Sequence, residues 1–549
     1  MPIRKTIVAA IALLASVWAL PVRAADLIVV NAKIIRDGLP AASALAVADG
    51  RFVGVGAERD IMALRRPATR VIDAGGRTII PGLVDSHIHA IRAGLSFASE
   101  ASFIGARSIK EAMDRLAAQA RAIRPDGWIV VAGGWTPQQF TENRVPSLAE
   151  VRAAAPGRPV YLQLFYRAAL LTPEAVALLG LERKGLPAGA LAQTDGEGNA
   201  TGWISGSAKA IARLYESLPK GDTKARMAST RAFFAALNAL GVTGVIDPGG
   251  HNIGPDDYEA VFGLWHRREL SLRVAYSICA PSAGKELAEY QAYTRFLPSG
   301  WGDDWLRFNG IGERVTWGLY NNNAPSAGQI RQFEDIALWA ARAGHTLTVH
   351  WNKDVSAGVL LDIFSRVNAR VPIAPLRWSV AHLHDTRPET LERMKHLGLG
   401  WLTQNSLYFA REDYLAALPS GRRGSAPPLV SALRLGLPTG AGTDGHRVMD
   451  YNPFVALQWM LDGKTVDGRP TRGVEETPGR IEALRLWTKG GAWFTFDEKR
   501  RGGIVPGMLA DFAVLSKDYW SLPVAEIGTI ESLLTVVGGR SVHAAGPFR

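Results

Sequence analysis

The sequence predicts an α/β fold, a (β/α)8 barrel of the TIM type, and two observations support it. Eight short apolar segments with strand character recur along the chain, at residues 82–89, 241–247, 272–278, 306–313, 345–350, 376–384, 399–405 and 437–444. Helical patterns lie between several of them, for example at residues 223–240, 330–343 and 388–397. Strands that alternate with helices indicate βα units and a parallel sheet, and eight such units close into a barrel.

The chain begins with the pattern of a secretory signal peptide over residues 1–24. Arg4 and Lys5 precede an apolar stretch at residues 7–20, and residues 22–24 offer a small-residue cleavage site. We therefore expect export to the periplasm or secretion, with retention as an uncleaved anchor as the alternative. After cleavage we expect no stable membrane insertion, since no other stretch is long and apolar enough to span a bilayer.

The segments that flank the barrel resemble each other. Residues 25–81 and 505–549 are both short β-rich runs separated by turns. We expect them to form one small β-sandwich domain built from both termini, beside a barrel over residues 82–504. A long insert at residues 90–230 follows the first barrel strand and is expected to form a mixed α/β subregion or lid.

Charge and cysteine content exclude several classes of protein. The formal charge of +11 includes three basic residues of the signal segment, so the mature chain carries about +8, and its charges are dispersed. This favours a solvated surface and a small-molecule substrate over nucleic acid, and leaves a homo-oligomer open. The single cysteine, Cys279, excludes an intrachain disulfide and a multi-cysteine zinc site.

The motif at residues 81–89, Pro-Gly-Leu-Val-Asp-Ser-His-Ile-His, ends the first predicted strand. Residues i and i+2 of a strand project to one face, so His87 and His89 would point together. Two solvated surface histidines are the alternative. The apolar residues that precede the pair favour a buried metal site.

Other ligand-type residues end later strands of the predicted barrel, where the functional residues of such barrels lie. They are Glu313, His350, His382, His384 and Asp444. Each has an alternative interpretation: a histidine at a barrel mouth can be purely structural, His384 can face solvent, and an aspartate before glycine often caps a turn. Their shared position favours one common site.

On these motifs the sequence resembles the amidohydrolase superfamily, in particular amidohydrolase family 3, the YtcJ-like metal-dependent hydrolases. The motifs are at residues 25–34, 50–56, 71–76, 81–89, 349–354, 381–384, 442–444 and 507–515. The resemblance implies that His87 and His89 bind one divalent metal and that His350 and His382 bind a second. It also implies that Asp444 is both a metal ligand and the catalytic proton shuttle. Neutral imidazoles suit Zn²⁺, which lowers the pKa of a bound water, and a carboxylate can then move the proton.

The fourth strand departs from the family pattern. Relatives usually carry a lysine there that is carboxylated to bridge two metals, whereas this chain has Glu313 in Asn-Gly-Ile-Gly-Glu-Arg-Val. We expect Glu313 to bridge instead, with Gly310 and Gly312 permitting a bulge that turns it inward. If it faces the helices and pairs with Arg314 or another base, the site holds one metal.

Substrate contacts are less specified by the sequence. Arg167 and Thr172 stand in the insert where relatives tend to have a histidine and an asparagine, so contacts there do not transfer. His384 and Trp351 are the predicted substrate-binding residues. Trp317, Tyr320 and residues 321–323 would complete an aromatic-lined mouth, and packing of the lid is the alternative.

The predicted activity is hydrolysis of a carbon–nitrogen bond in a non-peptide amide, such as an N-acyl or N-formyl amine, by metal-activated water. Two alternatives come from other classes. One is a non-catalytic or regulatory binding protein on the same barrel, and the other is a metal-dependent isomerase or ester hydrolase.

Overall fold

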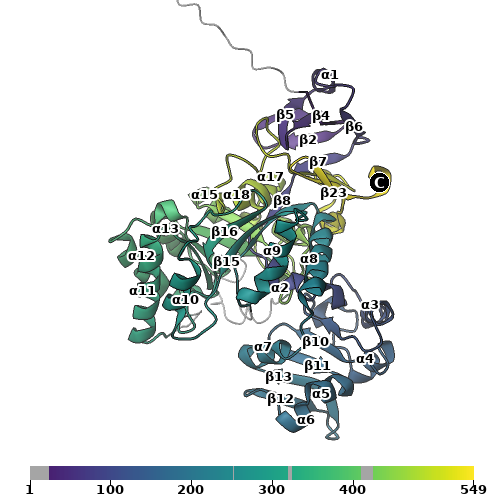
Figure 1. Cartoon of the computed structure of the whole chain (residues 1–549), viewed down its shortest axis with the longest axis vertical. Coiled ribbons are helices and arrows are strands. Elements are labelled where there is room, and N and C mark those ends of the chain that lie inside the picture. Colours follow the sequence, from purple (N-terminus) through teal and green to yellow (C-terminus); the bar gives the residue numbers. More distant parts are fainter. Residues whose placement is uncertain (1–23, 251–252, 320–323, 410–424) are drawn as a thin grey trace, which may run out of the picture.

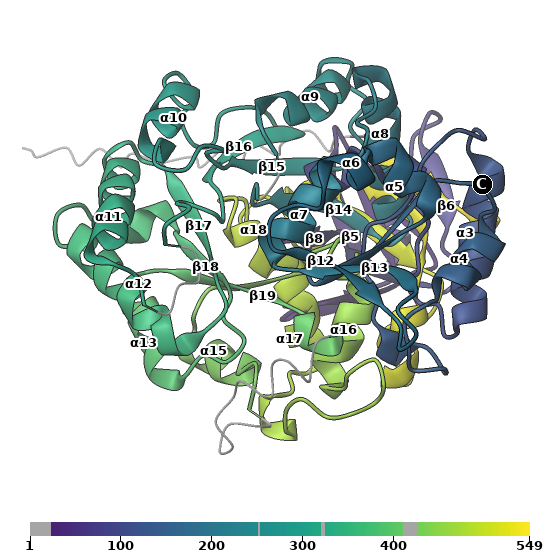
Figure 2. The ribbon, with the colours of Figure 1, turned by 90° about the horizontal axis from the view of Figure 1, so that it is seen from below.

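The computed structural model describes residues 24–250, 253–319, 324–409 and 425–549. Residues 1–23 of the predicted signal peptide lie outside them, as do Tyr320 and residues 321–323. Within the described part of the chain, no helix is both long and apolar enough to cross a membrane. The predicted (β/α)8 fold is confirmed, because eight parallel strands form one sheet that is ringed by helices (Figures 1 and 2).

The barrel strands follow the order in which they occur along the chain. They are β8 (Leu83–Asp85), β14 (Val242–Asp247), β15 (Arg273–Ile278), β16 (Leu306–Ile311), β17 (Thr346–Trp351), β18 (Ser379–His382), β19 (Gly400–Gln404) and β20 (Thr439–Gly442). The backbone N–H of Ser86 donates to the carbonyl of Ala441 at 3.0 Å, which joins the first strand to the last and closes the sheet.

Helices cover the outside of these strands. They are α8 (Thr223–Asn238), α9 (Glu259–His266), α10 (Glu286–Tyr293), α11 (Ala327–Arg342), α12 (Asp354–Asn368), α13 (Pro388–His396), α15 (Leu429–Leu435), α16 (Pro453–Asp462) and α17 (Arg480–Arg485). The largest apolar core lies between this ring and the strands. A smaller core fills the barrel, where Phe494 closes the amino end: a Cβ on Gly400 or Gly440 would lie within 2.6 Å of its ring.

Two sheets near the termini form the predicted β sandwich, at the top of Figure 1. One has the order β5-β4-β1-β6 and the other β23-β22-β21-β7-β2-β3. Their strands are β1 (Leu27–Val30), β2 (Lys33–Arg36), β3 (Leu39–Ala42), β4 (Ala44–Ala48), β5 (Arg51–Gly56), β6 (Arg70–Asp73), β7 (Thr78–Pro81), β21 (Phe512–Leu515), β22 (Ser532–Val537) and β23 (Arg540–Ala544). Because β7 pairs with β21, both ends of the chain contribute to one sheet and share an apolar core.

The insert forms an α/β unit on the opposite side of the barrel, at the bottom of Figure 1. Its sheet has the order β12-β13-β11-β10-β9, with β9 (Ile129–Val131), β10 (Val160–Leu164), β11 (Ala168–Leu171), β12 (Ala190–Thr194) and β13 (Ala200–Gly206). Helices α3 (Ile109–Ala122), α4 (Leu148–Ala154), α5 (Pro173–Leu179), α6 (Leu181–Lys184) and α7 (Ala208–Glu216) accompany it. Apolar clusters cover both faces of this sheet, so the insert has cores of its own.

Candidate functional site

Six of the predicted site residues converge at the carboxyl end of the barrel. His87 and His89 follow β8, Glu313 follows β16, His350 lies in β17, His382 ends β18 and Asp444 follows β20. One expectation about them is wrong: β8 ends at Asp85, so His87 and His89 are not strand residues. The backbone leaves the strand there, because the N–H of Ile88 donates to the carbonyl of Ile246 and that of His89 to Gly445.

Glu313 lies at the centre of the group. Its Oε2 is 3.3 Å from Nε2 of His87, and its Oε1 is 3.5 Å from Nε2 of His89. On its other side, the same Oε2 is 3.5 Å from Nδ1 of His350 and 3.7 Å from Nε2 of His382. The carboxylate therefore belongs to two clusters, one with His87 and His89 and one with His350 and His382, and the ligand atoms of each cluster lie within 4.8 Å of one another.

Asp444 faces mainly the first cluster. Its Oδ1 is 3.2 Å from Nε2 of His89 and 3.7 Å from Nε2 of His87. Its Oδ2 is 4.0 Å from Nδ1 of His382. The side chain of Asp444 is 12% exposed against 4% for Glu313. Asp444 is thus the more accessible of the two carboxylates to an incoming molecule.

The predicted bulge turns Glu313 inward. Tyr276 pairs with Phe308 but Ser277 pairs with Gly310, so β16 carries one extra residue at Asn309. Gly310 has φ +152°, and a Cβ there would lie 2.3 Å from the carbonyl oxygen of Thr346. A Cβ on Gly312 would lie 1.8 Å from a backbone oxygen, which only glycine avoids.

Arg314 does not pair with Glu313. Its guanidinium is buried, donates to the carbonyl of Ala280 at 2.9 Å and stacks 3.7 Å from the ring centre of Trp317. The alternative in which Glu313 faces the helices beside Arg314 therefore has no support in this arrangement.

Unusual backbone conformations place two other site residues. Asp444 has φ +57° and His382 has φ +70°, the left-handed region that non-glycine residues rarely adopt. The N–H of Asp444 donates to the carbonyl of His87 at 2.7 Å, which ties the ends of β20 and β8 together. The N–H of His382 donates to the side-chain oxygen of Gln404 at 3.0 Å.

Asp85 also joins the ends of β8 and β20. Its carboxylate accepts hydrogen bonds from the N–H of His87 at 3.2 Å, the N–H of Thr443 at 3.0 Å and the hydroxyl of Thr443 at 2.6 Å. Gly442 leaves room for this contact, since a Cβ there would lie 2.4 Å from the nitrogen of His87. Burial raises the pKa of Asp85 to about 7 despite these three donors.

Hydrogen bonds also orient two of the imidazoles. Nδ1 of His89 lies 2.7 Å from the carbonyl oxygen of Gly249 and donates to it, so Nε2 is the nitrogen that faces Glu313 and that would bind a metal once it is deprotonated. The amide of Asn352 lies 3.0 Å from Nε2 of His350, whose Nδ1 then faces the same carboxylate.

The charges of the site favour a cation. Burial opposes ionisation of Glu313, but the charge of His89 and the other facing imidazoles outweigh it and hold its pKa well below the usual range. Burial likewise opposes the charge of Asp444, yet His89 and its neighbours lower that pKa to about 2. Burial lowers the pKa of His87, which favours the neutral form that ligates metals.

The residues present fit a metal ion. Nε2 of His87, Nε2 of His382 and Oε2 of Glu313 are buried and make no hydrogen bond of good geometry. Two ligand atoms that are each 2.0–2.1 Å from a tetrahedral zinc lie about 3.3 Å apart. The 3.3–3.7 Å between Glu313 and its four imidazoles is close to that spacing and longer than an ordinary hydrogen bond.

The two residues predicted to bind substrate differ in position. His384 lies next to the site, with its ring 6.0 Å from that of His382 and Nε2 bonded to the hydroxyl of Ser406. Trp351 is fully buried in the core between strands and helices and donates to Ser356 at 3.1 Å. It follows His350 in β17 and so faces outward, away from the metal ligands, and this position does not support a contact with substrate.

The other residues noted in the sequence fall outside the metal cluster. Thr172 is buried directly before α5, and its hydroxyl makes no capping bond: it donates to the carbonyl of Arg158 and accepts from the N–H of Val160. Arg167 lies at the turn between β10 and β11, 5.1 Å from the ring centre of Phe165. Trp317 donates to the carbonyl of Pro281 and is 38% exposed.

Sequence reasoning missed a contact between a histidine and a glutamate next to the site. Nε2 of His446 contacts Oε2 of Glu100, which joins the loop after Asp444 to the start of the insert. The signal was available, because His446 stands two residues after Asp444 in the same motif. Its partner could not be found, because Glu100 precedes it by 346 residues.

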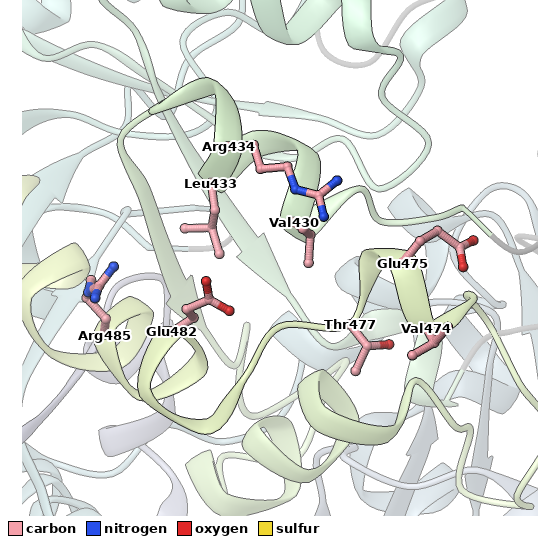
Figure 3. A pocket seen from close by; sticks show the side chains of 8 residues that line it. All are labelled: Val430, Leu433, Arg434, Val474, Glu475, Thr477, Glu482 and Arg485. Carbon is pink, nitrogen blue, oxygen red and sulfur yellow. The ribbon is translucent and has the colours of Figure 1, made fainter. Parts of the chain in front are cut away.

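A separate hollow of about 390 Å³ lies on the outer surface, beside α15 and α17 (Figure 3). Two of its charged side chains have partners: Arg485 pairs with Asp37 at 2.6 Å, and Glu482 accepts from the N–H of Gly479 at 2.8 Å. None of the predicted site residues lines this hollow, and the cluster around Glu313 is the candidate site.

The family of the chain follows from comparison with known proteins. The sequence profile described as the amidohydrolase family matches residues 70–543, most of the chain. The chain belongs to the amidohydrolase family. The predictions of this family and of an amidohydrolase enzyme are thereby confirmed.

Full-length relatives agree with this assignment. The chain is 24% identical to protein LONG AFTER FAR-RED 3 of Arabidopsis thaliana, over 94% of this chain and 92% of the relative. It is 22% identical to the N-substituted formamide deformylase of Arthrobacter pascens, over 94% and 97%. It is 23% identical to the putative amidohydrolase YtcJ of Bacillus subtilis, over 91% and 96%.

Solved structures share the fold of this amidohydrolase. An uncharacterized metal-dependent hydrolase from Pyrococcus furiosus has a TM-score of 0.64 at 19% identity, with 90% of this chain and 100% of that chain covered. Atrazine chlorohydrolase TrzN from Arthrobacter aurescens TC1, complexed with zinc, has a TM-score of 0.54 at 15% identity, with 94% and 95% covered.

Proposed function

We propose that this chain is an exported, metal-dependent hydrolase that cleaves the carbon–nitrogen bond of an N-formyl or N-acyl amine. The observation that carries the proposal is the position of Glu313, whose carboxylate lies within 3.7 Å of four imidazoles in two clusters. His87 and His89 would hold one divalent ion, His350 and His382 a second, and Glu313 would bridge them. Bound zinc would supply Lewis acidity and lower the pKa of water.

Asp444 is the proposed proton carrier. Its low pKa keeps it ionised near neutral pH, so it can accept a proton from the attacking water, and its exposure leaves it within reach of the substrate. The same carboxyl group can then donate the proton to the leaving nitrogen. Contact with His89 and the bond from its N–H to His87 hold it in place for both transfers.

The proposed substrate class rests on the relatives and on the accessible carboxylate of Asp444. The Arthrobacter pascens relative is named for the deformylation of N-substituted formamides. TrzN, which shares the fold, is described as complexed with zinc. Two metals with one carboxylate bridge and an accessible Asp444 suit hydrolysis of a small amide. Export of the chain is proposed on its N-terminal pattern alone.

The test is hydrolysis of a panel of N-formyl and N-acyl amines by the purified zinc-loaded chain. We expect turnover that chelation abolishes and zinc restores. His87→Ala combined with His89→Ala should lower bound zinc and abolish turnover while the protein stays folded. His345→Gln is a matched control, because His345 is also a buried histidine of the barrel but is not one of the proposed ligands. It directly precedes β17, and its Nδ1 bonds to the hydroxyl of Ser299.

Two outcomes would contradict the proposal. Full metal content in the double variant would show that the two histidines are not ligands. A zinc-loaded chain that turns over no amide but hydrolyses esters or lactones, or rearranges its substrate, would replace amide hydrolysis with one of the other chemistries open to this barrel.

A further inference from the structure

Arg447 is an arginine buried without an ion pair at the junction of the insert and the barrel. Its side chain is 3% exposed, and its Nε and Nη1 make no hydrogen bond. Among the described residues no carboxylate pairs with it. Its guanidinium instead stacks 3.5 Å from the ring centre of Tyr215 of α7. A buried cation without a direct ion pair is costly, which favours a role for it.

Two more donor groups without acceptors lie near it in the insert. The side-chain nitrogen of Gln163 is buried without a partner, since its amide oxygen accepts from Tyr161 at 2.8 Å. The rings of Tyr161 and Tyr215 are 5.6 Å apart, which places Gln163 beside the tyrosine that Arg447 covers. The hydroxyl of Tyr166, close enough to interact electrostatically with Arg447, also has no partner.

The carboxylate of Glu100 acts electrostatically on Arg447, but both of its oxygen atoms contact other groups. Its Oε1 accepts from the hydroxyl of Ser96 at 2.6 Å, and its Oε2 contacts His446. The junction therefore holds more buried donors than acceptors. An anion with several oxygen atoms would supply the acceptors, and a guanidinium recognises a carboxylate in a bidentate manner.

Arg447 lies close in the chain to Asp444 of the metal cluster. Arg447 lies three positions after Asp444, so their Cα atoms are at most about 11 Å apart. The loop is fixed against the insert, because a Cβ on Gly133 would lie 1.7 Å from the carbonyl oxygen of Arg447. The span between Arg447 and Asp444 is no longer than a small molecule with a chain of several carbon atoms.

We infer that Arg447, Tyr166 and Gln163 form a subsite that binds a carboxylate of the substrate, at the end away from the scissile carbon–nitrogen bond. The inference rests on the proposed function and narrows its substrate class to N-formyl or N-acyl amino acids. Arg167, at the turn that carries Tyr166, adds a second positive charge to this side of the site.

The test compares substrates that differ only in the carboxylate. N-formyl amino acids of increasing chain length, from N-formylglycine to N-formylaminohexanoate, are set against N-formyl alkylamines of equal length. We expect the best carboxylate to exceed its neutral partner by about 10- to 100-fold in kcat/KM, mainly through KM. Arg447→Met should remove that preference and leave the neutral substrates within about threefold.

Two further variants distinguish a loss of the subsite from a general effect of removing a buried side chain. Tyr166→Phe removes only a hydroxyl and should lower the preference about fivefold. Arg377→Met removes a cation that lies 4.9 Å from the ring centre of Trp493 at the other end of the barrel, and should leave the preference unchanged. Equal rates on both substrate series, or a preference that survives in Arg447→Met, would overturn the subsite.

Calorimetric titration with the product aminohexanoate separates this inference from the proposed function. If the parent hydrolyses no formamide but binds aminohexanoate more tightly than hexylamine, and Arg447→Met does not, the subsite stands and the proposed reaction fails. If formamides are hydrolysed without any effect of Arg447, the reaction stands and the subsite fails.

Discussion

The two ends of the barrel differ in how closely their buried charged groups approach one another. At the amino end, Arg273 and Asp511 form a buried bidentate pair at 2.8 and 2.9 Å, and Arg307 and Asp497 lie 3.1 Å apart. At the carboxyl end, the closest atoms of Glu313 and its imidazoles are 3.3–3.7 Å apart. The first spacing is that of hydrogen-bonded ion pairs, and the second is that of groups arranged around a cation.

This difference indicates that buried ion pairs at the amino end stabilise the fold, whereas the groups at the carboxyl end serve the reaction. The Arg273–Asp511 pair joins the barrel to the terminal sheets, since Asp511 precedes β21 and Arg273 begins β15. The carboxyl end instead has left-handed backbone at His382 and Asp444 and buried nitrogens without hydrogen bonds. Substitutions at the two ends should therefore change different measured quantities.

The largest expected effect is on catalysis at the carboxyl end. Asp444→Asn keeps the shape of the side chain and an oxygen ligand but removes the base. We expect kcat to fall by about two to four orders of magnitude, measured with an N-formyl amine. The melting temperature should change little. Near-normal kcat would mean that Asp444 only caps the turn before Gly445.

The amino end should respond in stability. Arg273→Met leaves Asp511 buried without its partner, so the free energy of unfolding should fall by about 3–5 kcal/mol, measured by denaturant titration. Under conditions in which the variant is folded, kcat/KM should equal that of the parent. A large loss of kcat/KM in the folded variant would break the proposed division between the two ends.

Asp85 lies at the carboxyl end but acts through its neighbours, and it should give a smaller effect. Asp85→Asn weakens the contacts that place His87 and Thr443. We expect a loss of about 10- to 100-fold in zinc affinity or kcat. Asp85→Glu should not rescue it, because the space beside the carboxylate is too tight for a longer side chain: even a Cβ on Gly442 would lie 2.8 Å from Oδ1 of Asp85. If zinc affinity and kcat are unchanged and only stability falls, Asp85 belongs with the structural pairs.

Much of this arrangement could be predicted from the sequence. The alternation of apolar runs and helical patterns predicted the barrel. Apolar residues recur with a different period in helices than in strands, and this difference can be seen in short stretches of sequence. The glycines at residues 310 and 312 predicted the bulge, since a close backbone approach requires them. The histidine spacing suggested a shared strand face at His87 and His89, although the chain leaves the strand at Asp85.

Other features depend on distant residues and could not be predicted. Trp351 is different: it follows His350 in β17, and the alternation of adjacent strand residues already predicts that it packs outward. Glu100 and Tyr215 come from the insert, and no local pattern links them to His446 and Arg447. Contacts between segments hundreds of residues apart depend on packing, which local periodicity does not encode.

The central claim is that Glu313 is a carboxylate bridge between two metal sites, and metal content tests it most directly. Zinc per folded chain is measured by elemental analysis for the parent and for Glu313→Gln, with Glu334→Gln, which removes a surface ion pair with Arg366, as control. We predict about two zinc ions in the parent and in the control and about one or fewer in Glu313→Gln, since an anionic bridge offsets the repulsion between two cations. Equal zinc content in the parent and Glu313→Gln would contradict the claim.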